Sequence, residues 1–348
     1  MARDRRVHKR TILLTALGLV GIVVIVAVIY KVALDRETAA REAIQMQEML
    51  ARQTTDNTKY VEWNGVTYKP RGNLTTILFM GVDMTSEDLA KVMGYRGHGQ
   101  TDFVMLAVVD HDAKTVSRLQ IDRDTMLEIE TLGLFGHEAG MMTDHLSVQH
   151  HYGDGKEQSC GMVVRAVSRL LMGVPIEHYI ALSLDSIPKV NDAVGGVTVT
   201  LEDDFSRFDP EWTLGSTVTM HGDQTAWFVR SRMTVGDGSN ASRMNRQNQF
   251  LDKLAVMVKD KIKETPAFVG TLFNTLGASL VTDMTRGRII NEANRALDYQ
   301  VLAMDQLPGE HIVSGYGFVE FYPQQSAIEQ WVMDTFCSPV EGGGQTYQ

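Results

Sequence analysis

The first feature of the hydrophobic pattern is an almost unbroken apolar run over residues 11–30. A helix of this length spans about 30 Å, which matches the hydrocarbon thickness of a bilayer. A secretory signal peptide is the alternative, but its apolar region is usually shorter and ends at a cleavage site of small residues. The run here passes directly into Lys31 and a charged stretch. We therefore expect a transmembrane helix that is not cleaved.

The residues that follow predict a stalk and a small hairpin. From Ala33 to about Gln53, strong helix formers are interspersed with Arg and Glu, as is typical of an exposed helix. Asn64 and Gly65 then separate two short segments rich in β-forming residues. This dipeptide is a strong short-range signal for a two-residue β-hairpin turn.

From Leu74 onward, apolar runs alternate with segments of helical periodicity. The predicted strands are 77–83, 101–109, 115–121 and 178–184. The predicted helices are 160–171, 186–191, 223–233, 242–263 and 324–336, with further helices between 268 and 299. Near-continuous apolar strands suit a sheet that is covered on both faces. We therefore predict an α/β fold in which a central mixed or mainly parallel sheet is flanked by helices on both faces.

These patterns divide the chain into parts and give it an orientation. The parts are a basic tail (1–10), a transmembrane helix (11–30), a helical stalk with a small hairpin (31–73), a main α/β domain (74–266) and a C-terminal helical extension (267–348). The tail carries five positive charges and one negative charge. Because basic flanks stay in the cytoplasm, we expect a single-pass protein of the cell membrane with its main domain outside the cell.

The charge balance narrows the choice of partners. The chain has 43 acidic and 33 basic side chains, and since the tail has a net charge of +4, the remainder has a net charge of −14. A strongly acidic domain argues against a nucleic acid partner. Cys160 and Cys337 are the only cysteines. They are too few for a cysteine-based metal site. The sequence allows either a disulfide between them or two separate thiols.

Against this acidic background, four arginines gather between residues 229 and 247. They are Arg230, Arg232, Arg243 and Arg246. The planar guanidinium matches phosphate oxygens and keeps its charge at neutral pH. This pattern indicates a site for a phosphorylated ligand, while the structural alternative is a solvated helix face with local ion pairs.

Carboxylates mark the ends of the predicted strands. Asp83 ends the first, Asp102 begins the second, and residues 122–124 (Asp-Arg-Asp) follow the third. Ligands of open α/β sheets gather at strand ends. Asp102 reaches the same edge as the others only if its strand is antiparallel. Asp83 and Asp102 could then hold Mg²⁺ with waters and phosphate oxygens, although aspartates at strand ends are often turn formers or helix caps.

In order and spacing, these motifs resemble the LytR-CpsA-Psr family of Gram-positive cell-envelope proteins, over about residues 74–254. The matching segments are 78–83, 101–102, 121–125, 173–180, 192–197, 221–226, 229–232, 236–237 and 243–247. The resemblance implies a Mg²⁺-dependent phosphotransferase. Such an enzyme moves a teichoic acid, capsule or other glycopolymer from a polyprenyl-pyrophosphate carrier to a cell-wall acceptor such as peptidoglycan.

The resemblance also assigns roles to residues. The candidate catalytic residues are Asp83 and Asp102, which match the family's metal carboxylates, with Arg123 and Arg230. The candidate substrate-binding residues are Arg123, Asp124, Arg230, Arg232, Arg243, Arg246 and Gln247. Either Asp124 or Asp102 is a candidate base for the acceptor hydroxyl. The polyprenyl chain would enter an apolar cavity with candidate walls at Met162, Val163, Val167, Leu171, Phe250 and Leu254, which as ordinary core residues are explained equally well.

The chain departs from the family's usual pattern at several positions, and one departure is that a lysine often found near Thr143 is missing. Gln100 stands where Arg or Lys is frequent, Asp122 where Pro is common, and Met233 where His is common. Asp122 would add negative charge beside the expected pyrophosphate. Two alternatives to the transferase therefore stay open: a non-catalytic polyprenyl-phosphate-binding regulator of the envelope, and a lipid pyrophosphatase.

Overall fold

The computed structural model describes residues 61–95, 97–133 and 135–340. The predicted basic tail, the predicted transmembrane helix at 11–30 and the predicted helical stalk lie outside these ranges. Within them, no helix is both long enough and apolar enough to cross a membrane.

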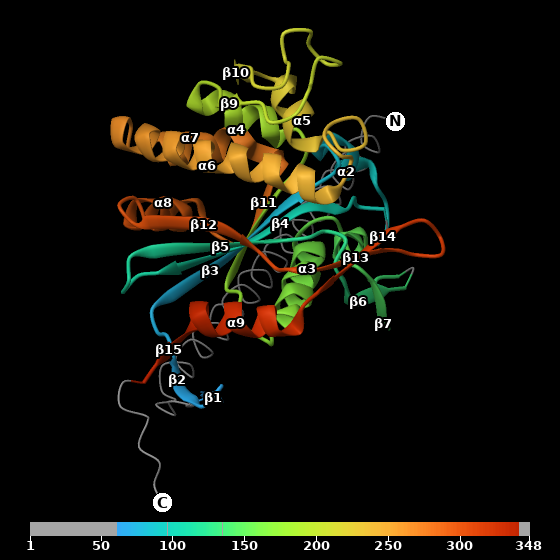
Figure 1. Cartoon of the computed structure of the whole chain (residues 1–348), viewed down its shortest axis with the longest axis vertical. Coiled ribbons are helices and arrows are strands. Elements are labelled where there is room, and N and C mark those ends of the chain that lie inside the picture. Colours follow the sequence, from blue (N-terminus) through green and yellow to red (C-terminus); the bar gives the residue numbers. More distant parts are fainter. Residues whose placement is uncertain (1–60, 96, 134, 341–348) are drawn as a thin grey trace, which may run out of the picture. The chain divides into compact units, whose positions relative to one another are not determined.

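A six-stranded mixed sheet organises the described residues (Figure 1). Its strands, in spatial order, are β11 (Leu280–Thr282), β8 (His178–Leu182), β3 (Leu74–Val82), β4 (Thr101–Asp110), β5 (Thr115–Ile121) and β12 (Gln300–Gln306). β3 is parallel to β8 and β5 is parallel to β12, whereas β4 is antiparallel to both of its neighbours. The prediction of a central mixed sheet with flanking helices is therefore confirmed.

One face of the sheet is packed against α3 (Glu157–Leu170) and α9 (Gln325–Phe336). Successive side chains of a strand point to opposite faces, so alternate residues of β3 and β4 enter this core. Leu78 and Leu106 are fully buried there, and they pack in one cluster with Val163 of α3 and Trp331 of α9. Continuous burial of this kind supplies most of the hydrophobic stabilisation of a domain.

The opposite face is covered by a separate layer of helices (Figure 1). This layer comprises α4 (Ser186–Val194), α5 (Asp223–Arg230), α6 (Asn240–Glu264), α7 (Phe268–Leu276) and α8 (Arg286–Arg295), with the small strands β9 (Thr198–Thr200) and β10 (Thr217–Thr219). Phe205, Trp212 and Phe228 are buried at the centre of its own core, which includes no residue of the central sheet.

Short elements surround these layers. They are the hairpin strands β1 (Val61–Trp63) and β2 (Val66–Pro70), the helix α2 (Ser86–Lys91), the hairpin β6 (Met126–Leu132) and β7 (Glu138–His145), the hairpin β13 (Gly309–Val313) and β14 (Val319–Pro323), and β15 (Cys337–Pro339), which pairs with β2. Asn64 and Gly65 both have positive φ, as the two-residue turn between β1 and β2 requires.

The elements differ from the predictions in three places. The helix expected over 223–233 ends at Arg230, and the helix expected to start at Ser242 starts at Asn240, because Ser239 caps it by accepting a hydrogen bond from the Ser242 amide. The segment 267–348 is not only helical, since it supplies β11 and β12 to the two edges of the central sheet. The strand β12 is largely exposed, which explains its weak hydrophobic signal. Both cysteines are free thiols.

Candidate functional site

The sheet brings the predicted carboxylates to one edge. Asp83 directly follows β3, and Arg123 lies just beyond the end of β5, which runs in the same direction. Because β4 is antiparallel to both strands, its first residues, including Asp102, reach the same edge. The strand that begins at Asp102 is therefore antiparallel to its neighbours, as the prediction for Asp102 required.

A close turn holds Asp83. Its Oδ1 accepts a hydrogen bond of 2.6 Å from the amide of Gln100, and its own amide donates to the Gln100 carbonyl at 3.0 Å. Gly99 has φ +76°, and a Cβ at this position would lie 2.9 Å from the Asp83 carboxylate. Only glycine permits this approach without strain, so Gly99 is part of what positions Asp83.

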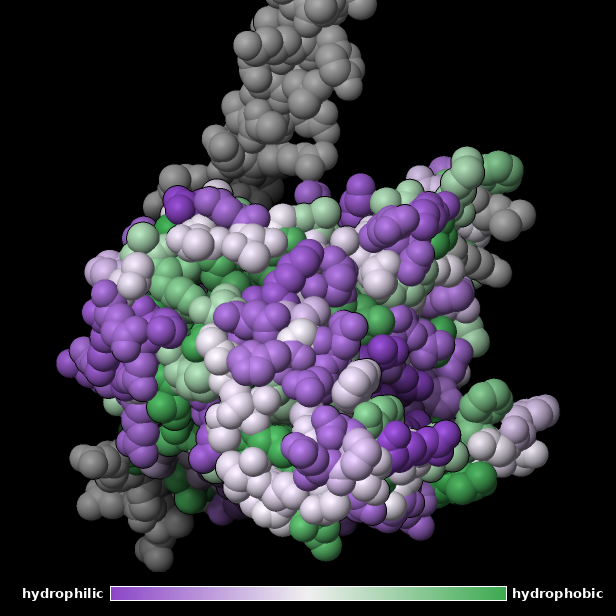
Figure 2. Space-filling view, turned by 90° about the horizontal axis from the view of Figure 1, so that it is seen from above, coloured by the Kyte–Doolittle hydropathy of each residue, from purple (hydrophilic) through white to green (hydrophobic). Residues whose placement is uncertain are grey.

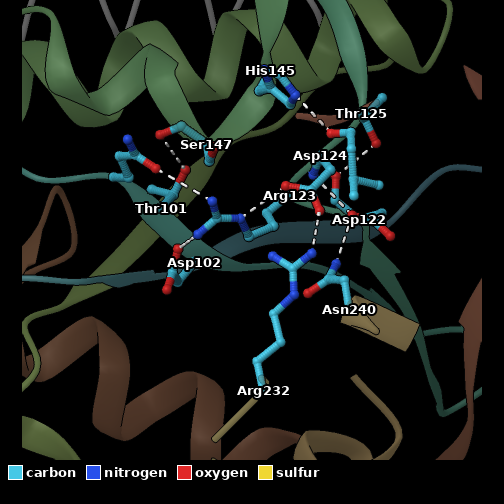
Figure 3. A network of polar contacts seen from close by, with 12 residues as sticks. Thr101, Asp102, Asp122, Arg123, Asp124, Thr125, His145, Ser147, Arg232 and Asn240 are labelled. Atoms are coloured by element: carbon cyan, nitrogen blue, oxygen red, sulfur yellow. Dashed lines mark hydrogen bonds and ion pairs between the residues drawn. The ribbon is translucent and has the colours of Figure 1, made fainter. Parts of the chain in front are cut away.

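Arg123 is the centre of a polar network (Figure 3). Its Nη1 donates to Asp102 Oδ1, its Nε donates to Asp124 Oδ1 at 3.0 Å, and its Nη2 is 3.5 Å from Gln100 Oε1. The second oxygen of Asp102 accepts from Arg243 Nη1 at 3.4 Å. Gln100, which stands where the family often has a cation, therefore contacts the central arginine as an acceptor.

The network holds more buried charge than its own contacts satisfy. Arg232 approaches Asp124 Oδ2 at 3.9 Å (Figure 3), yet this oxygen and the Nε atoms of Arg232 and Arg243 are buried without a hydrogen-bond partner among the described residues. Burial, followed by the charges of Arg123 and Arg232, lowers the pKa of Arg243 to about 10. Buried polar groups are normally paired, so the unpartnered Nε atoms of Arg232 and Arg243 are available as donors to an anion.

An apolar cavity of about 390 Å³ opens from this network between the sheet and the helical layer. Its sheet wall includes Phe79, Phe103 and Met105, and its helical wall includes Leu254 and Leu272. The charged and amide groups in its lining are Asp83, Asp102, Arg230, Arg243 and Gln247. Seen from above, hydrophilic residues cover much of the molecule and hydrophobic residues show between them (Figure 2). The cavity is therefore mostly apolar, and it has arginine side chains at the end next to the polar network.

Only one of the two predicted cavity walls is correct. Phe250 and Leu254 of α6 line the cavity. The proposed α3 wall, formed by Met162, Val163, Val167 and Leu171, is buried on the other side of the sheet. Helical periodicity identifies the apolar side of α3 but not the face of the sheet that it covers, which is why this expectation failed.

Four arginines of the site differ from the fifth. The cationic end of the cavity is formed by four residues that we call the site arginines: Arg123, Arg230, Arg232 and Arg243. The Arg230 side chain is exposed and has no ion-pair or hydrogen-bond partner among the described residues. Arg246, by contrast, is buried away from the cavity and donates to Asp203 Oδ2 at 2.6 Å, Ser242 Oγ at 2.8 Å and the Ser231 carbonyl. It holds the loop before α6, so the structure does not place it with the other substrate-binding candidates.

Gln247 and Met233 occupy contrasting positions. Gln247 lines the cavity, accepts from Gln120 Nε2 at 2.9 Å and donates to the Val229 carbonyl at 3.2 Å. Its amide is therefore held at the cavity wall. Met233 is 81% exposed and is not among the residues that line the cavity.

Asp122 does not face the cavity. It is buried, and its carboxylate accepts hydrogen bonds from the Asp124 amide at 2.8 Å, from Asn240 at 2.7 Å and from His311 at 3.0 Å. Internal donors therefore stabilise its negative charge, and the carboxylate does not point toward an anion in the cavity. The sequence reasoning missed both Asn240 and His311, and no local motif marks them.

The donor atoms suit magnesium in one respect. Asp83 and Asp102 supply carboxylate oxygens at the same cavity wall. In the described part of the chain, no group of three or more His, Cys, Asp or Glu side chains is placed to hold a metal ion. Mg²⁺ is typically held by one or two carboxylates, waters and substrate phosphates, so this pair fits it only together with a phosphorylated ligand.

The sequence of the chain is similar to those of known proteins. The model of the LytR_cpsA_psr family matches residues 37–334. The polyisoprenyl-teichoic acid–peptidoglycan teichoic acid transferase TagU of Bacillus mycoides is 24% identical over 320 residues, which are 92% of this chain and 94% of that protein. The TagU of Halalkalibacterium halodurans is 27% identical over 209 residues, 60% of each protein.

Solved structures share the fold. Protein gbs0355 from Streptococcus agalactiae has a TM-score of 0.59 at 17% identity, covering 76% of this chain and 88% of that chain. A structure described as TagT bound to LI-WTA has a TM-score of 0.57 at 18% identity, covering 76% of this chain and 90% of that chain. At such identities the likeness concerns the arrangement of the sheet and helices.

Proposed function

Because the chain belongs to the LytR-CpsA-Psr family, we propose that it is a phosphotransferase that moves a glycopolymer from a polyprenyl-pyrophosphate carrier to a cell-wall acceptor such as peptidoglycan. The observation that carries this proposal is the junction of an apolar cavity with the site arginines. An amphipathic ligand with a long apolar chain and an anionic head matches both halves. The TagU relatives, named as transferases of teichoic acid to peptidoglycan, support it.

In this proposal the cavity orients the carrier. The polyprenyl chain packs against Phe103, Leu254 and their neighbours, and the pyrophosphate lies against the site arginines. The buried Nε atoms of Arg232 and Arg243 donate to its oxygens, which satisfies groups that otherwise lack partners. Because several fixed cations surround the reacting phosphate, they stabilise the charge that develops during transfer.

The chemical step is a displacement at the phosphorus that carries the glycopolymer. An acceptor hydroxyl oxygen forms a bond to this phosphorus, the bridging P–O bond of the pyrophosphate breaks, and polyprenyl phosphate leaves. Both oxygens of Asp102 accept hydrogen bonds from arginines, whereas Asp124 Oδ2, 3.9 Å from Arg232, accepts none among the described residues. We therefore assign the hydroxyl proton to Asp124. Mg²⁺, when held by Asp83 and Asp102, would neutralise further phosphate charge.

We also propose that residues 11–30 anchor the protein in the cell membrane, with the N-terminus in the cytoplasm and the described residues outside. The basic tail and the apolar run support this orientation. An anchor keeps the cavity near the bilayer in which a polyprenyl carrier resides.

The test uses the full chain, purified in detergent and incubated with Mg²⁺, a lipid-linked pyrophosphoryl saccharide and peptidoglycan fragments. We expect a covalent product between the saccharide phosphate and the fragment that disappears with Arg123→Ala. Binding of the lipid without turnover would favour the regulator and sink the transferase. Release of phosphorylated saccharide, even when acceptor is present, would favour the pyrophosphatase.

A further inference from the structure

The C-terminal hairpin β13–β14 is attached to the loop that carries Arg123. His311 of β13 lies with Nε2 3.0 Å from Asp122 Oδ2, and the Phe321 amide of β14 donates to the Asp124 carbonyl at 2.8 Å. The His311 ring packs against the Phe321 ring, with 4.5 Å between the centroids. The hairpin therefore contacts the residues on both sides of Arg123, although it lies nearly 200 positions later in the chain.

Asp122 connects this hairpin to a second arginine. Its Oδ1 accepts from Asn240 Nδ2 at 2.7 Å, and Asn240 Oδ1 in turn accepts from Arg243 Nη2 at 2.6 Å. Asp122, Asn240 and Arg243 are all buried. One chain of contacts thus runs from His311 through Asp122 and Asn240 to Arg243, and the same carboxylate accepts the Asp124 amide next to Arg123.

Loss of the contact between His311 and Asp122 would disturb the site arginines. A buried carboxylate that loses a donor must find another partner or move. The other partners of Asp122 are Asn240 and the backbone beside Arg123, so a movement of Asp122 displaces the supports of both arginines. Arg123 and Arg243 share Asp102, hence a shift of either changes the cationic end of the cavity.

We propose that His311 is a positioning residue of the active site, which holds Asp122 so that Arg123 and Arg243 are aligned for the pyrophosphate. The hairpin β13–β14 is then a functional part of the site rather than an accessory. This inference rests on the proposed function for the identity of the anion. The contacts of His311 would affect the binding of any pyrophosphate at the site arginines, whatever group the pyrophosphate carries.

The test compares three variants of the full chain. His311→Ala removes the contact to Asp122, His311→Gln keeps a side-chain N–H donor at a similar reach, and Val313→Ala changes an exposed residue of the same strand as a matched control. Two quantities are measured: the kcat and KM of saccharide transfer, and the affinity for farnesyl pyrophosphate. Thermal unfolding of each variant monitors the fold.

We expect His311→Ala to lower kcat by about tenfold or more and to weaken farnesyl pyrophosphate binding severalfold, because small displacements of catalytic groups are costly. His311→Gln should recover most of both, and Val313→Ala should match the wild type. Equal kinetics and affinity for His311→Ala and the wild type would overturn the inference, as would an equal loss in Val313→Ala. If the wild type transfers nothing, the proposed function fails, and the farnesyl pyrophosphate affinities alone decide the role of His311.

Discussion

The two faces of the central sheet are built for different purposes. On one face, Leu78 and Leu106 are fully buried against α3 and α9 in a continuous core. On the other face, the neighbouring residues Phe79 and Met105 of the same strands line a cavity. A single residue step along a strand therefore separates a side chain of the packed core from one that borders the cavity.

The helical layer can leave this space open because it does not depend on the sheet for its own packing. Phe205, Trp212 and Phe228 give it a separate core. Protein interiors are normally close-packed, and unfilled apolar volume lowers stability. A second core offsets this cost and keeps the arginines on α5 and α6 in place beside the cavity. In the function proposed here, stability and ligand binding thus belong to different faces.

The largest effect should come from Arg123, at the functional end of the cavity. Arg123→Ala removes the donor shared by Asp102, Asp124 and Gln100, and we expect transfer to fall by about 10³-fold, since single electrostatic contacts to a transition state are worth this much. Arg123→Lys should recover only part of the activity, because lysine keeps the charge without the planar fork. Initial rates of product formation measure both. A rate for Arg123→Ala within tenfold of the wild type would contradict the assignment.

A matched pair on β4 tests the comparison between the faces most directly. Leu106→Ala, on the packed face, should lower the free energy of unfolding by about 3 kcal/mol, as expected for a fully buried leucine. Met105→Ala, on the cavity face, should cost only about 1 kcal/mol, because this side chain already borders empty space.

Denaturant unfolding measures the stability of each variant of the pair, and binding of farnesyl pyrophosphate measures the function. Met105→Ala should change the affinity, whereas Leu106→Ala should leave it unaltered in the folded fraction. The distinction between the faces fails if both variants lose the same stability and the same affinity.

Acid should weaken the fold through a buried histidine outside the cavity. His150 is 1% exposed with Nδ1 2.9 Å from the His98 carbonyl, and burial lowers its pKa from 6.5 to about 4. The unfolded chain therefore binds a proton between pH 6.5 and 4 that the folded chain does not. Stability present above pH 6.5 is lost as the pH falls toward 4, by about 3 kcal/mol.

Denaturant unfolding at a series of pH values measures this loss. His150→Asn keeps a donor near the Nδ1 position but cannot be protonated, so its stability should vary less with pH over this range. His221→Gln, at an exposed histidine, is the control and should behave as the wild type. An unchanged pH dependence in His150→Asn would show that other groups cause the loss.

Several features were predictable because the signals were local. The apolar runs of β3, β4 and β5 are long, and Asp83, Asp102 and Arg123 mark their ends. Once β4 is antiparallel, the topology alone brings these three residues together. The sequence thereby predicted that these residues would meet at one edge of the sheet, and the strand directions bring them there.

Other features depend on contacts that no local pattern encodes. The periodicity of α3 is satisfied on either face of the sheet, so its side chains were wrongly expected in the cavity. Arg246 lies one turn from Arg243, yet a single acidic partner, Asp203, turns it into a structural residue. His311 meets Asp122 across 189 positions of sequence, and only the folded chain reveals the pair.

The smallest effect is expected at Arg230, and it separates a binding arginine from a structural one. The Arg230 side chain is exposed and has no partner among the described residues, so Arg230→Ala should leave the unfolding free energy within about 0.5 kcal/mol of the wild type. Its loss should raise the KM for the lipid substrate by about tenfold, the magnitude of one charge-assisted contact. Arg246→Ala should show the opposite pattern, with reduced stability because Asp203 is left without its cation. Steady-state kinetics and denaturant unfolding on the two variants distinguish these outcomes. If Arg230→Ala unfolds more easily and binds normally, the cationic end of the cavity is a structural ion-pair network, and the division of labour between the two faces of the sheet is wrong.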